Sequence, residues 1–469
     1  MAKKVTGRQV KKSILFSVSA QIVSLGVSLL LNLIVPKFIS ELDYANWQTY
    51  MLYVGYVGIL HFGLLDGIML RYSEYDYDEL DKEKLRSQFI ILLCLLSFAF
   101  LVVFGIGIKQ NNYISKIVFV MVALAIFSRN IYTYTSYTFQ MTNRIGMYAS
   151  LVIIQRLFYA IGILCLLFLR VKGFIWFCIV DISADVLGNL YGVLNNKGLY
   201  FGKISKISNA LKEASINITS GIILLAANWS SMLLIGGAKM VVQWHWTLLT
   251  FGKVSFAFSV SNLFLTFVTA ISIVLFPSLK RLDKASLPNM YVEIRNAVSL
   301  VLFIAMTMYF PGAYILSLWL PKYSESLVYL GILLPIIVFS SKVSLLTNNY
   351  LKAYRAEIKM LIINIVSVVL AFILYLFSAY VLDDLSSVMI SVVIAVMFRS
   401  IISEIVVSRI IGKQFLPEYI IELIITTGFI ISARLFSLLK GAILYLIILA
   451  IYLLLKKNEV KKLLHKAKL

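Results

Sequence analysis

Ionisable side chains lie inside long apolar segments of this sequence, and their positions are the first indication of chemistry. Asp66 and Arg71 stand near the end of one apolar run, while Arg129 and Arg156 lie within two others. An ionisable group at membrane depth costs at least about 2.5–3.5 kcal/mol on insertion, so each needs an oppositely charged partner or a water-filled path. Such side chains therefore either bind charged ligands or join helices as ion pairs.

The composition indicates which elements hold these side chains. Of the 469 residues, 61% are hydrophobic and 14% are charged, whereas soluble proteins have about 25% charged residues. Apolar segments long enough to cross about 30 Å of hydrocarbon recur along the chain. Because lipid offers no partners to backbone groups, the sequence predicts an all-α membrane protein with about fourteen transmembrane helices. The predicted spans are 13–35, 44–68, 88–108, 115–139, 147–169, 174–194, 214–236, 252–276, 297–318, 326–348, 360–381, 386–408, 416–433 and 440–455.

The distribution of the 43 Lys and Arg residues predicts the orientation. With the N-terminus inside, most of them fall in cytoplasmic segments, so both termini are expected in the cytoplasm. The basic N-terminus leads into a long apolar run with no small-residue cleavage site, which is typical of a retained first helix. The net charge of +21 is attributed to topology rather than to nucleic acid, because no base-reading or stacking motif accompanies it.

Several classes of function are disfavoured by what the sequence lacks. Cys94, Cys165 and Cys178 have no ligand-type spacing, so neither a metal site nor a disulfide framework is expected. No nucleotide-binding P-loop occurs, so ATP-driven export by this chain alone is disfavoured. The predicted loops are too short for the catalytic domain of a membrane glycosyltransferase or polymerase, so the chain is expected not to be an enzyme.

A polar segment divides the first twelve predicted helices into two sets of six. The predicted domains are an N-terminal lobe (1–194), a cytoplasmic linker (195–213), a C-terminal lobe (214–408), and two additional helices with a basic cytoplasmic tail (409–469). A weak internal similarity supports this division. The stretches "RNIYTYTSYTFQMTNRIGMY" from Arg129 and "KVSLLTNNYLKAYRAEIKML" from Lys342 each place one cation about ten residues before a polar, basic turn. Two six-helix halves with a substrate path between them are a known transporter plan.

Four segments carry a resemblance to a known family. They are "LIVPKFISELDYANWQTY", "GLLDGIMLRY", "ISIVLFPSLKRLD" and "LKAYRAEIKMLIIN". In their order, spacing and topological position they are similar to the Wzx-type flippases of the multidrug/oligosaccharidyl-lipid/polysaccharide (MOP) exporter superfamily. The resemblance implies a MATE-like fold, with two pseudo-symmetric lobes around a central cleft. It also implies flipping of an undecaprenyl-pyrophosphate-linked oligosaccharide across the cytoplasmic membrane of a bacterium, by alternating access, for cell-surface polysaccharide assembly. The implied partners are this glycan lipid, the bilayer and other polysaccharide-assembly proteins.

One predicted helix departs from the family pattern. The seventh, "NITSGIILLAANWSSMLLIGG", lacks the aspartate that many relatives place before the glycine pair, and Asn228, Ser230 and Ser231 occupy that neighbourhood. A coupling-cation site there is in doubt. No cofactor is expected, and coupling to a Na⁺ or H⁺ gradient stays open.

Cations inside or beside the helices are the candidate substrate-binding residues, because a diphosphate needs a cationic path to replace its hydration. These candidates are His61, Arg71, Arg129, Arg156, Lys253 and Lys342. Each has a structural alternative. Arg156 and Asp185 reach the same depth and could form an ion pair that stabilises the first lobe, and Arg129 could pair with Asp181. Lys342 could snorkel to the cytoplasmic surface, His61 could be a packed histidine or a proton carrier, and Lys253 could anchor the outer interface.

Two competing functions are weighed against the flippase. A multidrug exporter of the same fold would favour an acidic, apolar cavity for cationic drugs, whereas buried cations dominate here. A membrane glycosyltransferase or polymerase would need paired carboxylates or a donor-binding domain. Transport of a defined lipid-linked oligosaccharide by the protein alone would distinguish the three.

Overall fold

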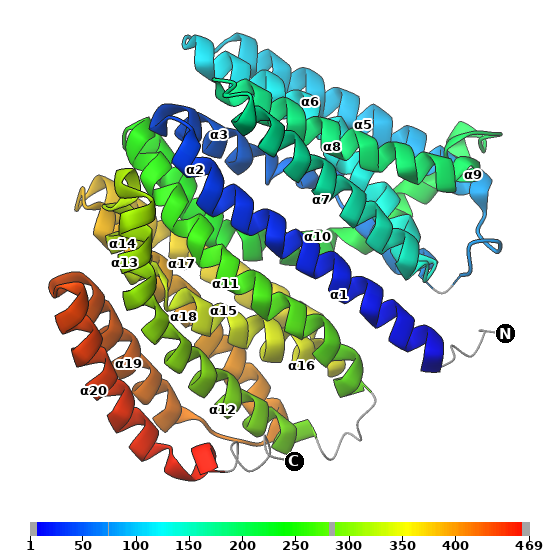
Figure 1. Cartoon of the computed structure of the whole chain (residues 1–469). Coiled ribbons are helices and arrows are strands. Elements are labelled where there is room, and N and C mark those ends of the chain that lie inside the picture. Colours follow the sequence, from blue (N-terminus) through cyan, green and yellow to red (C-terminus); the bar gives the residue numbers. More distant parts are fainter. Residues whose placement is uncertain (1–6, 74, 281–286, 462–469) are drawn as a thin grey trace. The chain divides into compact units, whose positions relative to one another are not determined.

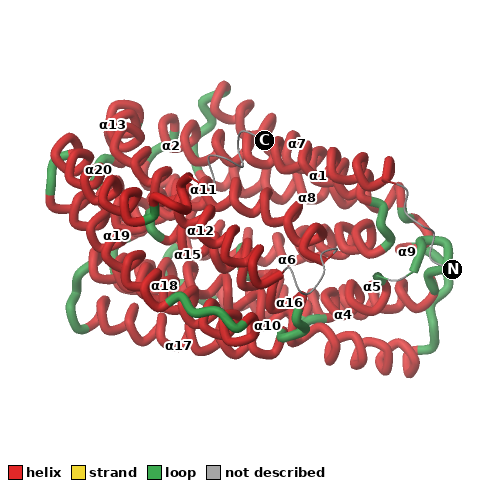
Figure 2. The backbone as a smooth tube through the Cα atoms, turned by 90° about the horizontal axis from the view of Figure 1, so that it is seen from below, coloured by secondary structure: helices red, strands yellow, loops and turns green. Residues whose placement is uncertain are grey.

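The structure is a computed structural model that describes residues 7–73, 75–280 and 287–461. Its side chains are described except at 7–15, 17, 18, 264 and 266–280. Across these ranges every regular element is a helix, and the helices are joined by short loops (Figure 2). The resemblance segment at 271–283 and the end of the basic tail at 462–469 lie outside the residues so described.

The chain forms two compact units, Met1–Trp229 and Ser230–Leu469. The helices of unit 1 are α1 (Gly7–Leu29), α2 (Val35–Phe38), α3 (Glu41–Val54), α4 (Leu64–Tyr72), α5 (Lys82–Ile108), α6 (Tyr113–Met141), α7 (Ile145–Phe168), α8 (Phe174–Asn195) and α9 (Lys197–Tyr200). Helix α10 (Ile207–His245) begins in unit 1 and continues into unit 2. The remaining helices of unit 2 are α11 (Leu248–Lys280), α12 (Leu287–Ala305), α13 (Tyr309–Trp319), α14 (Ser326–Leu333), α15 (Ile336–Lys342), α16 (Asn348–Ala353), α17 (Glu357–Tyr380), α18 (Leu385–Ile411), α19 (Leu416–Leu435) and α20 (Leu438–Leu455).

The number and length of the apolar helices confirm a multi-pass membrane protein. Within the part of the chain that the structure describes, 12 helices are long and apolar enough to cross a membrane, and 13 if one bent pair is counted as a span. Helix α11 covers the eighth predicted span. Short polar residues set several helix starts. The Asp43 N–H donates to Ser40 Oγ at 3.0 Å, and the Ile114 N–H donates to Asn112 Oδ1 at 2.9 Å.

Helix α6 is the centre of unit 1, where it contacts α3, α4, α5, α7 and α8. Figure 1 shows α5 to α8 running alongside one another, with their labels in the cyan and green part of the chain. Helix α6 is mostly apolar but holds Arg129 near its middle, so this arginine lies among several helices. A charge in that position can reach partners on more than one neighbour.

The second predicted span is broken rather than continuous. Its two halves, Glu41–His61 and Leu64–Tyr72, meet at an angle of 59°. The break falls at Phe62 and Gly63, which have φ angles of 51° and 85°. Left-handed backbone suits glycine, because a side chain there meets the following carbonyl group. The apolar pattern of the sequence continues through this point, which is why it predicts a single helix.

Gly63 and Gly67 bring α4 against the first part of α10, as expected from their spacing of four residues. A Cβ atom on Gly67 would overlap the backbone of Asn217, and one on Gly221 would overlap the backbone of Gly63. The two helices therefore touch through main-chain atoms. Nothing larger than hydrogen fits between them.

We expect Gly67→Ala to destabilise unit 1 by about 1–3 kcal/mol, because added atoms in a closed contact force the backbone apart. Gly105→Ala is the matched control, since a Cβ on Gly105 meets nothing within 4 Å and alanine is the better helix former. Thermal unfolding in detergent measures the difference. Equal melting temperatures for the two variants would show that the α4–α10 contact is looser than the structure has it.

Unit 2 is built around the span Ser326–Ala353, of which 89% of the apolar window is buried inside the protein. This span consists of α14, α15 and α16 with a π-helical segment at Val343–Thr347. Helices α11 and α18 contact both α14 and α15, and α12 and α19 cover further faces. Lys342 is the last residue of α15, and its side chain is buried among these helices.

Candidate functional site

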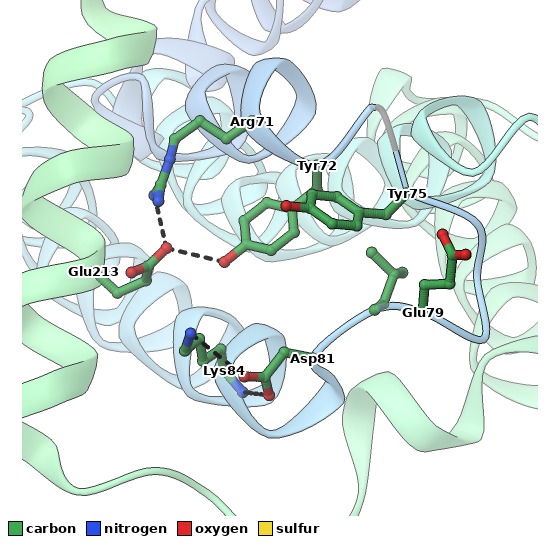
Figure 3. A pocket seen from close by; sticks show the side chains of 8 residues that line it. Arg71, Tyr72, Tyr75, Glu79, Asp81, Lys84 and Glu213 are labelled. Atoms are coloured by element: carbon green, nitrogen blue, oxygen red, sulfur yellow. Dashed lines mark hydrogen bonds and ion pairs between the residues drawn. The ribbon is translucent and has the colours of Figure 1, made fainter. Parts of the chain in front are cut away.

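An open pocket of about 220 Å³ lies at the end of α4 in unit 1 (Figure 3). It is lined by Arg71, Tyr72, Tyr75, Glu79, Leu80, Asp81, Lys84 and Glu213. Arg71 Nη1 donates to Glu213 Oε1 at 2.6 Å and to Asn217 Oδ1 at 2.5 Å, and the Tyr72 hydroxyl donates to the same Glu213 oxygen at 2.9 Å. The lining holds more carboxylates than cations. An anionic ligand would therefore compete with Glu213 for Arg71.

Arg129 binds two aspartates of α8 at the centre of unit 1. Its Nη2 donates to Asp181 Oδ2 at 2.8 Å and its Nη1 donates to Asp185 Oδ1 at 3.2 Å. The Tyr50 hydroxyl donates to Asp181 Oδ2 at 2.9 Å, and Gln155 Nε2 donates to Asp185 Oδ1 at 3.1 Å. Both aspartate side chains are buried, while that of Arg129 keeps 27% of its surface exposed. The arginine compensates two buried negative charges.

The structure thus pairs Asp185 with Arg129, not with Arg156 as the equal-depth argument expects. Arg156 lies on α7, half-buried, and within electrostatic range of Asp185. Depth along a helix fixes height in the membrane but not the direction in which a side chain points. The Asp185 carboxylate accepts a hydrogen bond from Arg129 of α6. Among the described residues Arg156 forms no ion pair.

Several polar groups of unit 1 interact electrostatically with Arg156 or with one another. Tyr148 of α7 and Tyr132 of α6 lie within electrostatic range of Arg156. Tyr148 also acts on Tyr137, which in turn faces Asp66 on α4. These groups come from three helices, α4, α6 and α7. They lie within predicted membrane spans, and polar groups at that depth are typical of a ligand path.

Unit 2 holds a buried cluster of four charges that the sequence reading missed as a set. Arg295 of α12 lies 3.0 Å from Glu404 of α18 and 3.0 Å from Glu422 of α19. Lys342 of α15 lies 2.8 Å and 2.7 Å from the same two carboxylates. All four residues are at most 3% exposed. Two cations and two carboxylates balance, and four helices are joined.

Lys342 is therefore not a snorkelling residue. Its side chain is fully buried and both carboxylates face it. The span Ser326–Ala353 that carries Lys342 is itself largely buried inside the protein, and the hydropathy pattern does not give the direction of a side chain. A substrate role for Lys342 would require that it leave two buried partners, which costs several kcal/mol.

The other predicted positions also have partners. Lys253 Nζ donates to Glu325 Oε2 at 2.6 Å. Arg399 of α18, which is not among the candidates, donates from Nε to Asn364 Oδ1 at 2.8 Å, while Glu404, five residues further on, pairs with Arg295 and Lys342. His61 is buried beside Asp66, with 3.8 Å between Nε2 and Oδ2. Within the described ranges, Arg156 is thus the one candidate cation that forms neither an ion pair nor a side-chain hydrogen bond.

The two units share a local arrangement that matches the internal similarity in the sequence. Arg129 in unit 1 and Lys342 in unit 2 each bind carboxylates on a later helix of the same unit, α8 or α18. The turns that follow them contain Asn143 and Arg355, which have φ angles of 53° and 54°. Equivalent cations and equivalent left-handed turns support an internal repeat.

The fold is similar to that of solved transporters of the MOP superfamily. No protein-family model matches the sequence, and no curated protein matches it.

Three solved structures show the likeness. The lipid II flippase MurJ in an inward closed conformation has a TM-score of 0.67 and 13% identity, over 94% of this chain and 99% of its own. An inward-facing MATE family multidrug resistance transporter has a TM-score of 0.60 and 14% identity, over 84% of this chain and 98% of its own. A MOP superfamily transporter from Pyrococcus furiosus, for which a binding pocket of reverse polarity suggests a different function, has a TM-score of 0.52 and 14% identity, over 87% and 99%.

Proposed function

We propose that the chain is a transporter that flips an undecaprenyl-pyrophosphate-linked oligosaccharide across the cytoplasmic membrane by alternating access. The protein would work without a covalent step, with both termini in the cytoplasm, and would serve cell-surface polysaccharide assembly. The fold, shared with a lipid II flippase and with multidrug transporters, is compatible with either kind of substrate. The charged residues of unit 1 favour the anionic glycolipid.

Arg156 is the observation that carries the proposal. It is a half-buried cation in the middle of a membrane-spanning helix, and no carboxylate neutralises it at ion-pair distance within the described residues. Such a position is tolerated when water or a ligand reaches the charge. A guanidinium presents a planar fork that matches phosphate oxygens in two parallel hydrogen bonds. Tyr132 and Tyr148 lie within electrostatic range of it.

The remaining predicted cations take secondary roles in this proposal. Arg71, at the pocket of Figure 3, can exchange Glu213 for a phosphate because its side chain is 32% exposed. Arg129 keeps part of its surface open while it compensates the two aspartates. Lys342 is assigned a structural role in the buried charge cluster of unit 2. Lys253, which pairs with Glu325, and His61, which is buried beside Asp66, are not assigned to the diphosphate.

A multidrug exporter is the second candidate, and one observation favours it. Asp66, Asp181 and Asp185 are buried acids in unit 1, and a cationic drug would be attracted to carboxylates. Two of the three are already compensated by Arg129, however. The acidic charge that is left is smaller than the burial of three aspartates suggests.

Ligand binding to the purified protein separates the two candidates. Undecaprenyl diphosphate is expected to raise the melting temperature in detergent, because a ligand that binds the folded state stabilises it. Undecaprenol, which has the same tail without phosphate, and a cationic dye are expected to have no effect. Stabilisation by the dye alone would favour the exporter and remove the support for the flippase.

A further inference from the structure

The segment that connects α8 to α10 carries exposed apolar and exposed basic side chains together. Residues 195–212 contain four lysines and no aspartate or glutamate. All four lysines are exposed: Lys197, Lys203, Lys206 and Lys212. Four large apolar side chains lie between them and are 51% to 76% exposed: Phe201, Ile204, Ile207 and Leu211. Apolar residues interleaved with cations are typical of a surface that binds the interface of a membrane.

Hydrogen bonds from the start of α5 hold this segment in place. Arg86 donates from Nε to the carbonyl oxygen of Lys203 at 2.7 Å and from Nη1 to that of Gly198 at 2.6 Å. Gln88 Nε2 donates to the carbonyl oxygen of Ala210 at 3.0 Å. The segment is therefore bound to α5 through its backbone, and the exposed side chains are not what holds it there.

These hydrogen bonds place the segment at the depth where the membrane begins. Arg86 and Gln88 directly precede the mostly apolar run of α5 that starts at Phe89 and ends at Ile108. Hydrocarbon surrounds such a run, so the headgroup region lies beside the residues that precede it. Helix α9 lies at this end of the α5–α8 bundle (Figure 1). In the predicted orientation, this end meets the cytoplasmic leaflet.

We propose that residues 197–212 form a docking surface for acidic phospholipid headgroups, which we call the linker surface. Its four apolar side chains enter the boundary of the acyl chains, and its four lysines contact the phosphates. The cytoplasmic leaflet carries acidic lipids, and each lysine near such a leaflet strengthens binding by about fivefold. This inference goes beyond the proposed function and does not depend on the transported glycan.

The linker surface is continuous with residues that hold Arg71. Glu213 and Asn217, in the turns of α10 that follow it, accept hydrogen bonds from Arg71. A linker surface bound to headgroups also restrains these first turns of α10. Acidic lipid therefore helps to position one wall of the pocket shown in Figure 3.

A nitroxide at position 204 measures the depth of the linker surface in a bilayer. Ile204→Cys is labelled in the full-length chain, with the exposed Cys94 and Cys165 replaced by serine. Asp78→Cys is the matched control, because Asp78 is also exposed and lies in the loop before α5 at the same end of unit 1. We expect the label at 204 to collide with oxygen, which concentrates in hydrocarbon, and the label at 78 to collide with a water-soluble nickel complex. Equal access of the nickel complex to both labels would overturn the proposal and favour an acidic protein as the partner.

Lipid composition tests the role of the lysines. Nanodiscs of phosphatidylcholine are compared with nanodiscs that also contain phosphatidylglycerol of the same acyl chains. We expect the acidic lipid to lower nickel access to position 204 several-fold, and high salt to reverse the effect. Lys203→Gln combined with Lys206→Gln should remove most of this difference. Lys109→Gln combined with Lys172→Gln removes two exposed lysines from other loops and should retain it.

Two results of the lipid comparison would contradict the assignment. One is that acidic lipid has no effect on the wild type. The other is an effect that survives the loss of both Lys203 and Lys206, because headgroups would then be recognised elsewhere. No glycan is present in these measurements, so their outcome is independent of whether the protein transports the proposed substrate.

Discussion

Arg295→Met is expected to abolish accumulation of the folded protein. The substitution leaves Glu404 and Glu422 buried with Lys342 as their one remaining cation. Removal of one partner from a buried ion cluster costs about 3–5 kcal/mol, because a charge is left uncompensated. Total stabilities of folded proteins are about 5–15 kcal/mol. Fluorescence-detected size-exclusion of the detergent-solubilised protein measures the loss.

The control and a rescue variant make this expectation specific. Arg409→Met removes an exposed arginine of α18 and should accumulate like the wild type. Arg295→Met combined with Glu422→Gln restores the balance of one cation and one carboxylate, and should recover part of the protein. Normal accumulation of Arg295→Met alone would mean that the cluster is hydrated or rearranged.

Arg156→Gln is expected to lower transport by about ten- to a hundredfold while the protein accumulates normally. One charge-assisted contact to a diphosphate in a partly desolvated site contributes about 1.5–3 kcal/mol. Arg156 forms no ion pair among the described residues, so its loss does not leave a carboxylate without its cation. Arg156→Lys keeps the charge without the planar fork and should be intermediate. Initial rates in liposomes, normalised to protein content, measure the effect.

Two comparison variants separate binding from stability. Arg170→Gln removes an exposed arginine from the loop after α7 and should transport normally. Arg129→Gln should instead lower the amount of protein, since Asp181 and Asp185 lose their cation, and Asp185→Asn in the same chain should recover part of it. If Arg156→Gln transports at the wild-type rate, the diphosphate does not contact this arginine.

The class of the protein follows from the sequence because hydropathy acts over whole segments. Lipid requires about twenty apolar residues per crossing, so composition and length alone identify the helices. The positions of the ionisable groups within those helices follow as directly. The pairing of Gly63 and Gly67 could also be anticipated, since residues four apart share a helix face.

The partners of the charges could not be predicted in the same way. Asp185 lies at the depth of both Arg129 and Arg156, and only the rotation of α8 decides between them. Arg295 was assigned to a loop because the predicted span starts at 297, whereas α12 starts at Leu287. Glu422, however, lies inside the thirteenth predicted span, 416–433. An acid retained inside an apolar helix indicates a buried cation elsewhere.

The break in the second span also could not be predicted from the hydropathy pattern. Its apolar residues continue across Phe62 and Gly63, and a single glycine inside a helical pattern is usually tolerated. The left-handed φ angles at these two residues turn the chain and place His61 beside Asp66. The sequence showed a histidine and an aspartate five residues apart, which on a straight helix do not share a face.

The account depends most directly on movement of a lipid-linked anionic glycan by this protein alone. Liposomes that contain only the purified protein should be loaded with one oligosaccharide on two carriers, undecaprenyl diphosphate and a neutral undecaprenyl ether. The appearance of the sugar in the opposite leaflet is then followed with a membrane-impermeant lectin. We predict protein-dependent transfer of the diphosphate-linked glycan and background transfer of the neutral one. Equal rates for both carriers, or no protein-dependent transfer of the diphosphate-linked glycan, would contradict the account.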